Sequence, residues 1–436
     1  MLATEELIAE AAQSQRLADD LPRHARRLPL YRAVGADRIE GDSGHGADKL
    51  RFFPFITKED IRRDFPGNFL GPEADVEAMV EQGMIELEQT SGTSEPRTPL
   101  LLPRGWWAEQ ERRALRLNPL VAGMLAQTPE PRRVTISSPV CSGEICFTSV
   151  PSHSERILGN TLYVSLSRYP FLWSESDLAR MAAEAVEWHP ELLDVDPVYG
   201  VVFARYCERL GVRLPSLRFI ICSYEFLSVV HRRILQRVFQ VPVFNLYGST
   251  ETGHLLMEDD QGRMRPSLET AHLEVLDFDT PQVPAAEVKP ARPVGELVVT
   301  TLTNEFMPLV RYRIGDFVER HVEPFRTRYV VHGRAADAFV TANGRRVTTW
   351  QVDQCFAGLS GIAHYQLMER ADGPWRLRFV PDRAGPVPEE ISNLRGRLQD
   401  TLALNTPLTV EPTDTLLAEN SGKFRLGYPA RGVSSA

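Results

Sequence analysis

The chain has 436 residues, of which 43% are hydrophobic and 25% charged, a composition typical of a globular protein with a large core. Its net charge of −9 and isoelectric point of about 5.7 argue against a general nucleic-acid-binding protein. No apolar run reaches the roughly 18–20 residues that a membrane helix needs, and the acidic start MLATEELIAEAAQSQ does not resemble a secretory signal. We therefore expect a cytoplasmic protein that binds neither nucleic acid nor membrane.

The basic residues are almost all arginine. Only four of the 49 basic positions are lysine, namely Lys49, Lys58, Lys289 and Lys423. A lysine at a position with a chemical role therefore stands out in this chain.

The first 70 residues are predicted to be rich in helices and loops. Thr57 is a candidate N-cap for a helix that ends at Pro66-Gly67. A strand-like run, Ile85 to Glu88, then leads into QTSGTSEPRTPL, Gln89 to Leu100. This stretch is small and hydroxylated, but it contains a single glycine and no lysine. Taken alone, it is more often a polar turn than a phosphate-binding loop.

A strand–helix–strand pattern follows in the middle of the chain. Leu217–Cys222 is a short apolar run of the kind found in buried parallel strands, and Val241–Gly248 is a second strand. Between them, one helical face carries Val230, Ile234, Leu235 and Val238. Ligands of such βαβ units bind beyond the carboxyl ends of the strands. The unit is therefore predicted to direct 223–225 and 247–252 at a common crevice.

The chain after the βαβ unit leads into a C-terminal part that begins near Gly333-Arg334. Residues 279–294 are rich in proline and are predicted to be a surface excursion, and Gly295–Leu302 is predicted to be a strand. Trp375–Val380 alternates apolar and basic side chains, as a half-exposed strand does. A helical stripe comprises Ile391, Leu394, Leu398 and Leu402. We predict a large α/β domain over residues 1–333 and a small α+β domain over 334–436.

Three stretches, in order, resemble the motifs of the adenylate-forming enzymes. These are TSGTSEPR, NLYGSTETG (Asn245–Gly253) and MPLVRYRIGDF (Met307–Phe317). The superfamily includes acyl- and aryl-CoA ligases, peptide-synthetase adenylation domains and luciferases. LPLYRAVGADRIE, FFPFITKEDIRRDFPGNFL and GELVVTTLTNEFMPLVRYRIGD look closest to its phenylacetate–CoA ligase-like branch. Each motif is weak alone, but their joint occurrence is specific, and the resemblance covers most of residues 28–425.

The resemblance implies ATP-dependent activation of a carboxylic acid with release of pyrophosphate. It implies a magnesium ligand at Glu251, an α-phosphate contact at Thr250, an adenine face at Tyr247 and a ribose acceptor at Asp316. A carboxylate is the hard oxygen ligand that Mg²⁺ prefers. The implied ATP- and AMP-binding residues are Ser91, Gly92, Thr93, Ser94, Arg97, Ser223, Tyr224, Glu225, Tyr247, Gly248, Ser249, Asp316 and Arg334.

The resemblance also implies a mobile C-terminal domain. Lys423, in ENSGKFRLGYP, matches the adenylation lysine, a compact charge that reaches both carboxylate and α-phosphate. Arg334 matches the hinge region. The candidate catalytic residues are therefore Lys423, Thr250 and Glu251.

The phosphate loop departs from the family pattern. The usual TSGTTG has a second glycine, which is absent here, so the loop is one residue short and Glu95 adds a negative charge. Slow or altered adenylation would follow.

Cys141, Cys146 and His153 could begin a zinc site, but the spacing is not C-x2-C and no second pair follows. We expect the five cysteines to be reduced thiols.

Several alternatives remain open from the sequence. Coenzyme A is the expected acceptor; an amine, a phenol, a carrier-protein thiol or a sulfur donor would use the same adenylation. A regulatory homologue that binds nucleotide without turnover is a third possibility, although Glu251, Asp316 and Lys423 are all retained. The acid-binding pocket is expected near Ser138, Tyr199, Gly200 and Tyr224, and its aromatic and small side chains weakly favour an aromatic acid.

Overall fold

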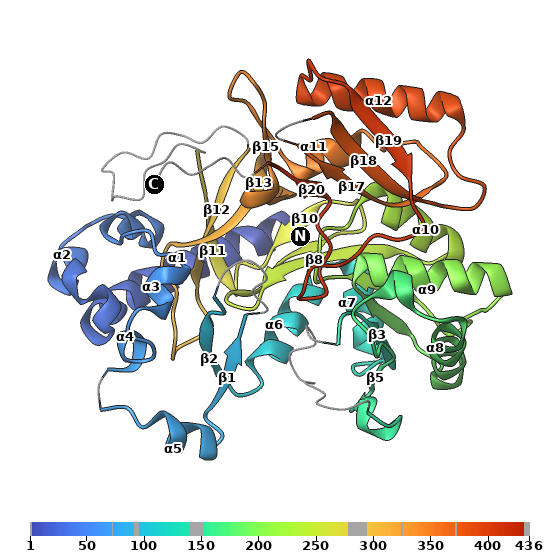
Figure 1. Ribbon diagram of the computed structural model, residues 1–436. Coiled ribbons are helices and arrows are strands. Elements are labelled where there is room, and N and C mark those ends of the chain that lie inside the picture. Colours follow the sequence, from blue (N-terminus) through green and yellow to red (C-terminus); the bar gives the residue numbers. More distant parts are fainter. Residues whose placement is uncertain are drawn as a thin grey trace. The chain divides into compact units, whose positions relative to one another are not determined.

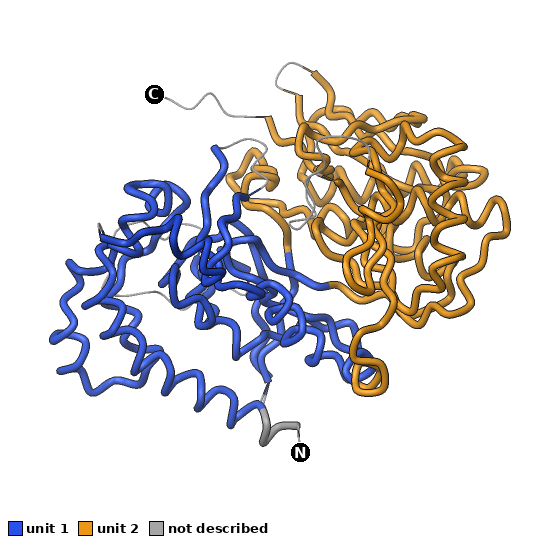
Figure 2. The backbone as a smooth tube through the Cα atoms, turned by 90° about the horizontal axis from the view of Figure 1, so that it is seen from below, with its two compact units in different colours: residues 1–122, 246–331 blue, residues 123–245, 332–436 orange. Residues whose placement is uncertain are grey.

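A computed structural model describes residues 2–71, 73–90, 96–139, 151–277, 294–323, 326–370 and 373–430 (Figure 1). The predicted phosphate loop at Ser91, Gly92, Thr93 and Ser94 lies outside the described residues, as do Cys141 and Cys146. The same holds for nearly all of the predicted excursion at 279–294. By its internal contacts the chain forms two compact units, shown in Figure 2. Unit 1 comprises 1–122 and 246–331, and unit 2 comprises 123–245 and 332–436.

Unit 1 begins with helices and continues into antiparallel strands. Its helical elements are α1 (Leu2–Arg27), η1 (Pro29–Val34), α2 (Ala36–Glu40), η2 (Gly46–Phe52), α3 (Lys58–Arg62), α4 (Gly67–Leu70), α5 (Val76–Glu81), α6 (Trp106–Leu115) and the start of α7 (Pro119–Gln127). Its strands are β1 (Ile85–Gln89), β2 (Pro99–Pro103), the end of β8 (Val243–Ser249), β9 (Gly253–Glu258), β10 (Met264–Pro266), β11 (Ala271–Leu276), β12 (Val294–Thr301), β13 (Tyr312–Glu323) and most of β14 (Arg326–Arg334). The larger sheet follows the order β11-β12-β13-β14-β10-β9-β8, and β1 pairs antiparallel with β2.

Two sequence predictions can be compared directly with unit 1. The predicted strand at Ile85–Glu88 is β1, and Thr57 does cap a helix, since its N–H and hydroxyl both donate to Asp60 Oδ2 at 2.9 Å. That helix, α3, ends at Arg62 and not at Pro66-Gly67, because Arg63 has extended backbone angles.

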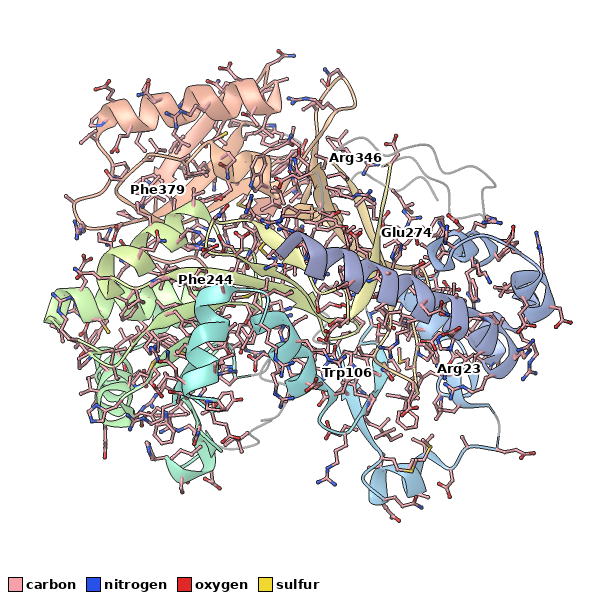
Figure 3. All side chains as sticks on the ribbon, turned by 180° about the vertical axis from the view of Figure 1, so that it is seen from behind. Arg23, Trp106, Phe244, Glu274, Arg346 and Phe379 are labelled. Atoms are coloured by element: carbon pink, nitrogen blue, oxygen red, sulfur yellow. The ribbon has the colours of Figure 1, made fainter. Side chains whose placement is uncertain are left out.

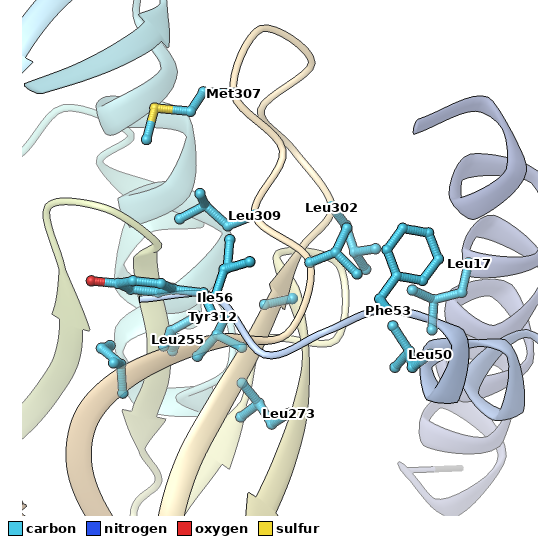
Figure 4. Close-up of a cluster of buried hydrophobic side chains, with 14 of the residues drawn as sticks. Leu17, Leu50, Phe53, Ile56, Leu255, Leu273, Leu302, Met307, Leu309 and Tyr312 are labelled. Carbon is cyan, nitrogen blue, oxygen red and sulfur yellow. The ribbon is translucent and has the colours of Figure 1, made fainter. Parts of the chain in front are cut away.

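The core of unit 1 joins the long first helix to the strands. Leu17 and Leu21 lie one helical turn apart on α1, and both are buried. They belong to a cluster that also contains Phe53, Leu273 and Tyr312 (Figure 4). Tyr312 thus has its ring in the core while its hydroxyl remains available for a hydrogen bond.

Unit 2 is built on parallel strands. Its elements up to residue 245 are β3 (Arg133–Ile136), η3 (Ser154–Arg156), β4 (Ile157–Leu158), β5 (Thr161–Tyr163), η4 (Pro170–Leu172), α8 (Glu175–Trp188), β6 (Leu192–Val195), α9 (Pro197–Leu210), β7 (Phe219–Cys222), α10 (Val229–Phe239) and the start of β8. The strand order is β8-β7-β6-β3-β5-β4, in which only the edge pair β4–β5 is antiparallel. The predicted βαβ unit is confirmed as β7-α10-β8, with β7 and β8 parallel.

The C-terminal part of unit 2 forms a second sheet. Its elements are η5 (Ala335–Asp337), β15 (Phe339–Val340), β16 (Arg346–Val347), α11 (Thr349–Gln354), β17 (Ile362–Met368), β18 (Trp375–Pro381), α12 (Pro388–Leu402), β19 (Leu408–Pro412) and β20 (Gly427–Tyr428). The sheet order is β19-β18-β17-β20. The predicted strand at Trp375 and the predicted stripe of α12 are both present, and Leu394, Leu398 and Leu402 are buried.

The predicted domain boundary at 333/334 falls two residues after a boundary of the compact units, at Val331/His332. Unit 2 groups the C-terminal residues with 123–245 by contact. The division into domains 1–333 and 334–436 remains a prediction.

Candidate active site

In unit 1, the predicted adenine and ribose residues are brought together. Tyr247 lies near the end of β8 and Asp316 on β13, and the tyrosine hydroxyl donates to Asp316 Oδ2 at 2.7 Å. Only 6% of Asp316 is exposed. A buried carboxylate needs hydrogen-bond donors, and Tyr247 supplies one of them. The two residues are 69 positions apart in the chain, so the fold creates the pair.

Glu251, the predicted magnesium ligand, is held by two groups. It lies in the turn between β8 and β9 and is 6% exposed. Tyr312 donates its hydroxyl to Glu251 Oε1 at 3.0 Å, and Lys58 Nζ lies 3.6 Å from the same oxygen. Sequence reasoning assigned no role to Lys58 or Tyr312. The rarity of lysine was a signal that could have identified Lys58.

The turn that carries Glu251 depends on two glycines. A Cβ on Gly248 would lie 2.2 Å from the carbonyl oxygen of Gly253, and Gly253 itself has a φ of +74°. The chain reverses here with its two strands in close approach, which only glycine permits. Ser249 and Thr252 share a hydrogen bond of 3.0 Å inside the turn. Thr250, the predicted α-phosphate contact, lies half-buried between them.

In unit 2, the residues after β7 surround a buried carboxylate. The hydroxyls of Ser223 and Tyr224 donate to the two oxygens of Asp194, at 3.1 and 2.8 Å. Tyr224 has a φ of +73°, a strained conformation for a non-glycine residue. Burial, together with the charge of Asp194, raises the pKa of Tyr224 well above its ordinary value.

Lys423 lies in a loop docked at the carboxyl ends of the parallel strands. The residues after β3, β6 and β7 include Ser138, Asp196 and Glu225, and all three are near the lysine loop. Burial raises the pKa of Asp196 to about 7, and the nearby Lys423 opposes that rise. Burial, with the adjacent Asp196 carboxyl, raises the pKa of Glu225 well above its usual range, again opposed by Lys423. The charge of the lysine thus acts on two buried acids.

Other predicted site residues have different surroundings. Arg97 and Arg334 are exposed. Gly200 lies in α9, where a Cβ would meet Val195 Cγ2 at 3.0 Å, so its small size serves close packing of the helix on β6. Ser138 and Tyr199, predicted for the acid pocket, both contact the lysine loop. Their role toward an acid remains a prediction.

Magnesium is compatible with the residues present. Mg²⁺ keeps several waters and takes one or two carboxylates together with substrate phosphates. A single buried carboxylate, oriented by Tyr312, is such a donor, and Glu251 would hold the ion. Among the described residues, no group of three or more His, Cys, Asp or Glu side chains could hold a metal by itself.

The cysteines described by the structure are Cys207, Cys222 and Cys355, and all three are buried. None of the helices in the described ranges is long and apolar enough to cross a membrane.

The chain is similar to known phenylacetate–coenzyme A ligases. It is 26% identical to that of Pseudomonas putida over 360 residues, covering 78% of this chain and 74% of the relative. It is 24% identical to that of Thermus thermophilus over 384 residues, covering 83% and 78%. A search of protein-family models finds no match. These relatives confirm the predicted resemblance to adenylate-forming CoA ligases of the phenylacetate–CoA ligase-like branch.

The fold is shared with a solved CoA ligase. The crystal structure of 2-hydroxyisobutyryl-CoA ligase in the postadenylation state matches with a TM-score of 0.68 and 16% identity, over 96% of this chain and 89% of that one. The protein therefore has the predicted fold class, a large α/β N-terminal domain of the adenylate-forming type with a small C-terminal domain.

Proposed function

We propose that the protein is an ATP-dependent acid–CoA ligase that acts on an aromatic carboxylic acid, with phenylacetate as the first candidate. The observation that carries the proposal is the docking of Lys423 at the carboxyl ends of β3, β6 and β7. Ligands of parallel α/β sheets bind at that edge. The phenylacetate–coenzyme A ligases that resemble the chain support both the acid class and the acceptor.

The reaction has two steps. In the first, a carboxylate oxygen attacks the α-phosphorus of ATP, a new P–O bond forms and the bond to pyrophosphate breaks. In the second, the thiol of coenzyme A attacks the acyl carbon, loses its proton, and AMP departs with the bonding electrons. Both steps build negative charge on oxygens, which positioned cations stabilise.

The residues of unit 1 take the nucleotide and its leaving group. Asp316 would accept hydrogen bonds from the ribose hydroxyls, and Tyr247, hydrogen-bonded to it, would present its ring to the adenine. Glu251 would hold magnesium, which neutralises the departing phosphates when bound. Lys58, beside Glu251, would add a second positive charge.

The residues of unit 2 act on the acyl-phosphate centre. Lys423 would stabilise the charge shared between the carboxylate and α-phosphate in the transition state. Ser223, Tyr224 and Glu225 would border the adenine. We further propose that domain 334–436 swings near Arg334, withdrawing Lys423 to admit the acceptor, and that the protein works in the cytoplasm.

Pyrophosphate exchange with a panel of carboxylic acids tests the activation step. We expect exchange with phenylacetate or a related aromatic acid, and mass spectrometry should then detect the acyl-CoA when coenzyme A is added. Exchange without a CoA product would assign another acceptor, such as an amine or a carrier-protein thiol. ATP binding without exchange for any acid would reverse the proposal in favour of a non-catalytic nucleotide-binding protein.

A further inference from the structure

The loop around Lys423 is held through its backbone by side chains of unit 2. The Tyr199 hydroxyl lies within hydrogen-bond distance of two carbonyl oxygens, that of Gly422 at 2.9 Å and that of Arg168 at 2.8 Å, and Arg168 Nη1 donates to the carbonyl of Asn420 at 2.6 Å. Glu225 Oε1 accepts the N–H of Phe424 at 2.5 Å. These bonds flank Lys423 on both sides and do not use its side chain.

The loop has the shape that this docking requires. Gly422 has a φ of +85°, and a Cβ there would lie 2.2 Å from Ser138 Oγ and 3.0 Å from the hydroxyl of Tyr199. The backbone thus approaches the strand ends more closely than any larger residue permits. The N–H of Gly422 donates to Glu419 and the N–H of Glu419 to Lys423, each at 2.8 Å, which closes the turn.

Phe424 anchors the other end of the loop. It is 7% exposed, and its ring lies edge-on to Phe171, Tyr199 and His364, with centroids 5.8, 6.2 and 5.2 Å away. Edge-to-face pairs at these separations are favourable beyond the area they bury. Tyr199 therefore contacts the loop twice, by its hydroxyl at Gly422 and by its ring at Phe424.

We infer that Tyr199 and Glu225 are positioning residues for Lys423. Together with Arg168 they form a latch on residues 420–424 that places the lysine for adenylation and releases it for acyl transfer. This inference rests on the proposed function for its catalytic consequence, but the docking itself does not. It gives Glu225 a task in addition to bordering the nucleotide, and Tyr199 a task in addition to its predicted place in the acid pocket.

Two of the three latch residues, Tyr199 and Glu225, are tested by substitution, and deletion of the Tyr199 hydroxyl also removes its 2.8 Å contact with the carbonyl of Arg168. Tyr199→Phe keeps the ring and deletes the hydroxyl. Glu225→Ala deletes the acceptor for the Phe424 N–H, whereas Glu225→Gln retains an acceptor oxygen and should restore the bond. Tyr206→Phe is the matched control, because Tyr206 lies on the same helix α9 as Tyr199 and is also buried.

The latch is tested first by hydrogen–deuterium exchange of the peptide that covers 420–424. Exchange should be about tenfold faster in Tyr199→Phe and Glu225→Ala, as expected for the loss of one hydrogen bond. It should be unchanged in Glu225→Gln and Tyr206→Phe. Unchanged exchange in both deletion variants would overturn the latch, whether or not the protein proves to be a ligase.

The catalytic consequence is tested by the two half-reactions. In Tyr199→Phe and Glu225→Ala, adenylation should slow about tenfold, while acyl transfer from a supplied acyl-adenylate stays at the wild-type rate or rises. Glu225→Gln should recover most of the adenylation rate. Equal slowing of both half-reactions would contradict a positioning role. If the wild type adenylates no acid, the proposed function fails, and the exchange measurement still decides the latch.

Discussion

Tyr312 donates its hydroxyl to Oε1 of Glu251 at 3.0 Å, while its ring is fully buried in the core of unit 1 (Figure 4). The carboxylate proposed to bind magnesium is therefore fixed by a side chain that packing immobilises. A ligand held by a rigid donor loses little entropy when the metal binds, and such supporting partners tune metal affinity.

The variant Glu251→Gln tests that carboxylate. The amide keeps the size of the side chain but loses its charge, so adenylation should fall and the magnesium concentration for half-maximal rate should rise. Tyr312→Phe should shift the magnesium dependence in the same direction by a smaller amount, since the charge remains. Wild-type rates for Glu251→Gln at limiting magnesium would remove Glu251 from the site.

Nucleotide affinity tests Asp316. Asp316→Ala should weaken ATP binding by about 1–3 kcal/mol, the scale of lost charge-assisted hydrogen bonds. Calorimetric titration measures this directly. Tyr247→Phe is the companion variant, which removes the hydroxyl that donates to Asp316 at 2.7 Å and keeps the ring. Equal ATP affinity in Asp316→Ala and the wild type would show that the aspartate does not contact the nucleotide.

Lys58 should contribute to the first half-reaction. The stretch Gln89 to Leu100 contains one cation, Arg97, and no lysine, so a further positive charge is needed near the phosphates of ATP, and Lys58 Nζ is 3.6 Å from Glu251. Lys58→Met, which keeps the apolar stem, should slow adenylation by about ten- to a hundredfold. Lys49→Met in η2 is the matched control. If adenylation is equally fast in both variants at every magnesium concentration, Lys58 has no part in the reaction.

Acid stability should depend on the buried His24. It is 5% exposed on α1, and burial, with Arg23, Arg27 and Arg16 nearby, lowers its pKa from 6.5 to about 3. The unfolded chain then binds the proton more readily, so this contribution to stability is complete above pH 6.5 and is lost as the pH falls toward 3. A single such group changes the free energy of unfolding by up to about 1.4 kcal/mol per pH unit.

The variant His24→Leu should therefore flatten the pH dependence of the unfolding free energy between pH 6.5 and 4. Denaturant titrations at several pH values measure it, with the exposed His321→Gln as control. An identical pH slope in His24→Leu and the wild type would mean that His24 is not buried in the neutral form.

The sequence predicted those features that are carried by local patterns. The apolar run before Ser223 and the helical stripe from Val230 led to β7-α10-β8, because period and length distinguish strand from helix over such segments. The motif around Tyr247 led to the turn with Glu251. The resemblance also assigned Asp316 to the same nucleotide as Tyr247, although nothing local to β8 or β13 indicates their hydrogen bond.

Contacts between distant segments could not be predicted in this way. Lys58 and Glu251 are separated by more of the chain than any periodic pattern spans, and their proximity follows from tertiary packing. Tyr199 and Ser138 were predicted as pocket residues from their types and positions. The positive φ of Gly422, which lets the lysine loop approach them, is visible only in the folded chain. Figure 3 labels Trp106 on α6 and Phe379 on β18. The residues against which such large side chains pack are likewise determined by the folded chain.

The rates of the two half-reactions in Lys423→Ala test the central claim most directly. The variant should lose most adenylation in pyrophosphate exchange while ATP binding stays almost intact, because the lysine stabilises charge that develops only in the transition state. Given a chemically synthesised acyl-adenylate, it should transfer the acyl group to coenzyme A at nearly the wild-type rate, as should the control Lys49→Ala. Equal damage to both half-reactions would contradict the account of a lysine that acts in the first step and then withdraws, and full competence in both would show that Lys423 has no catalytic role.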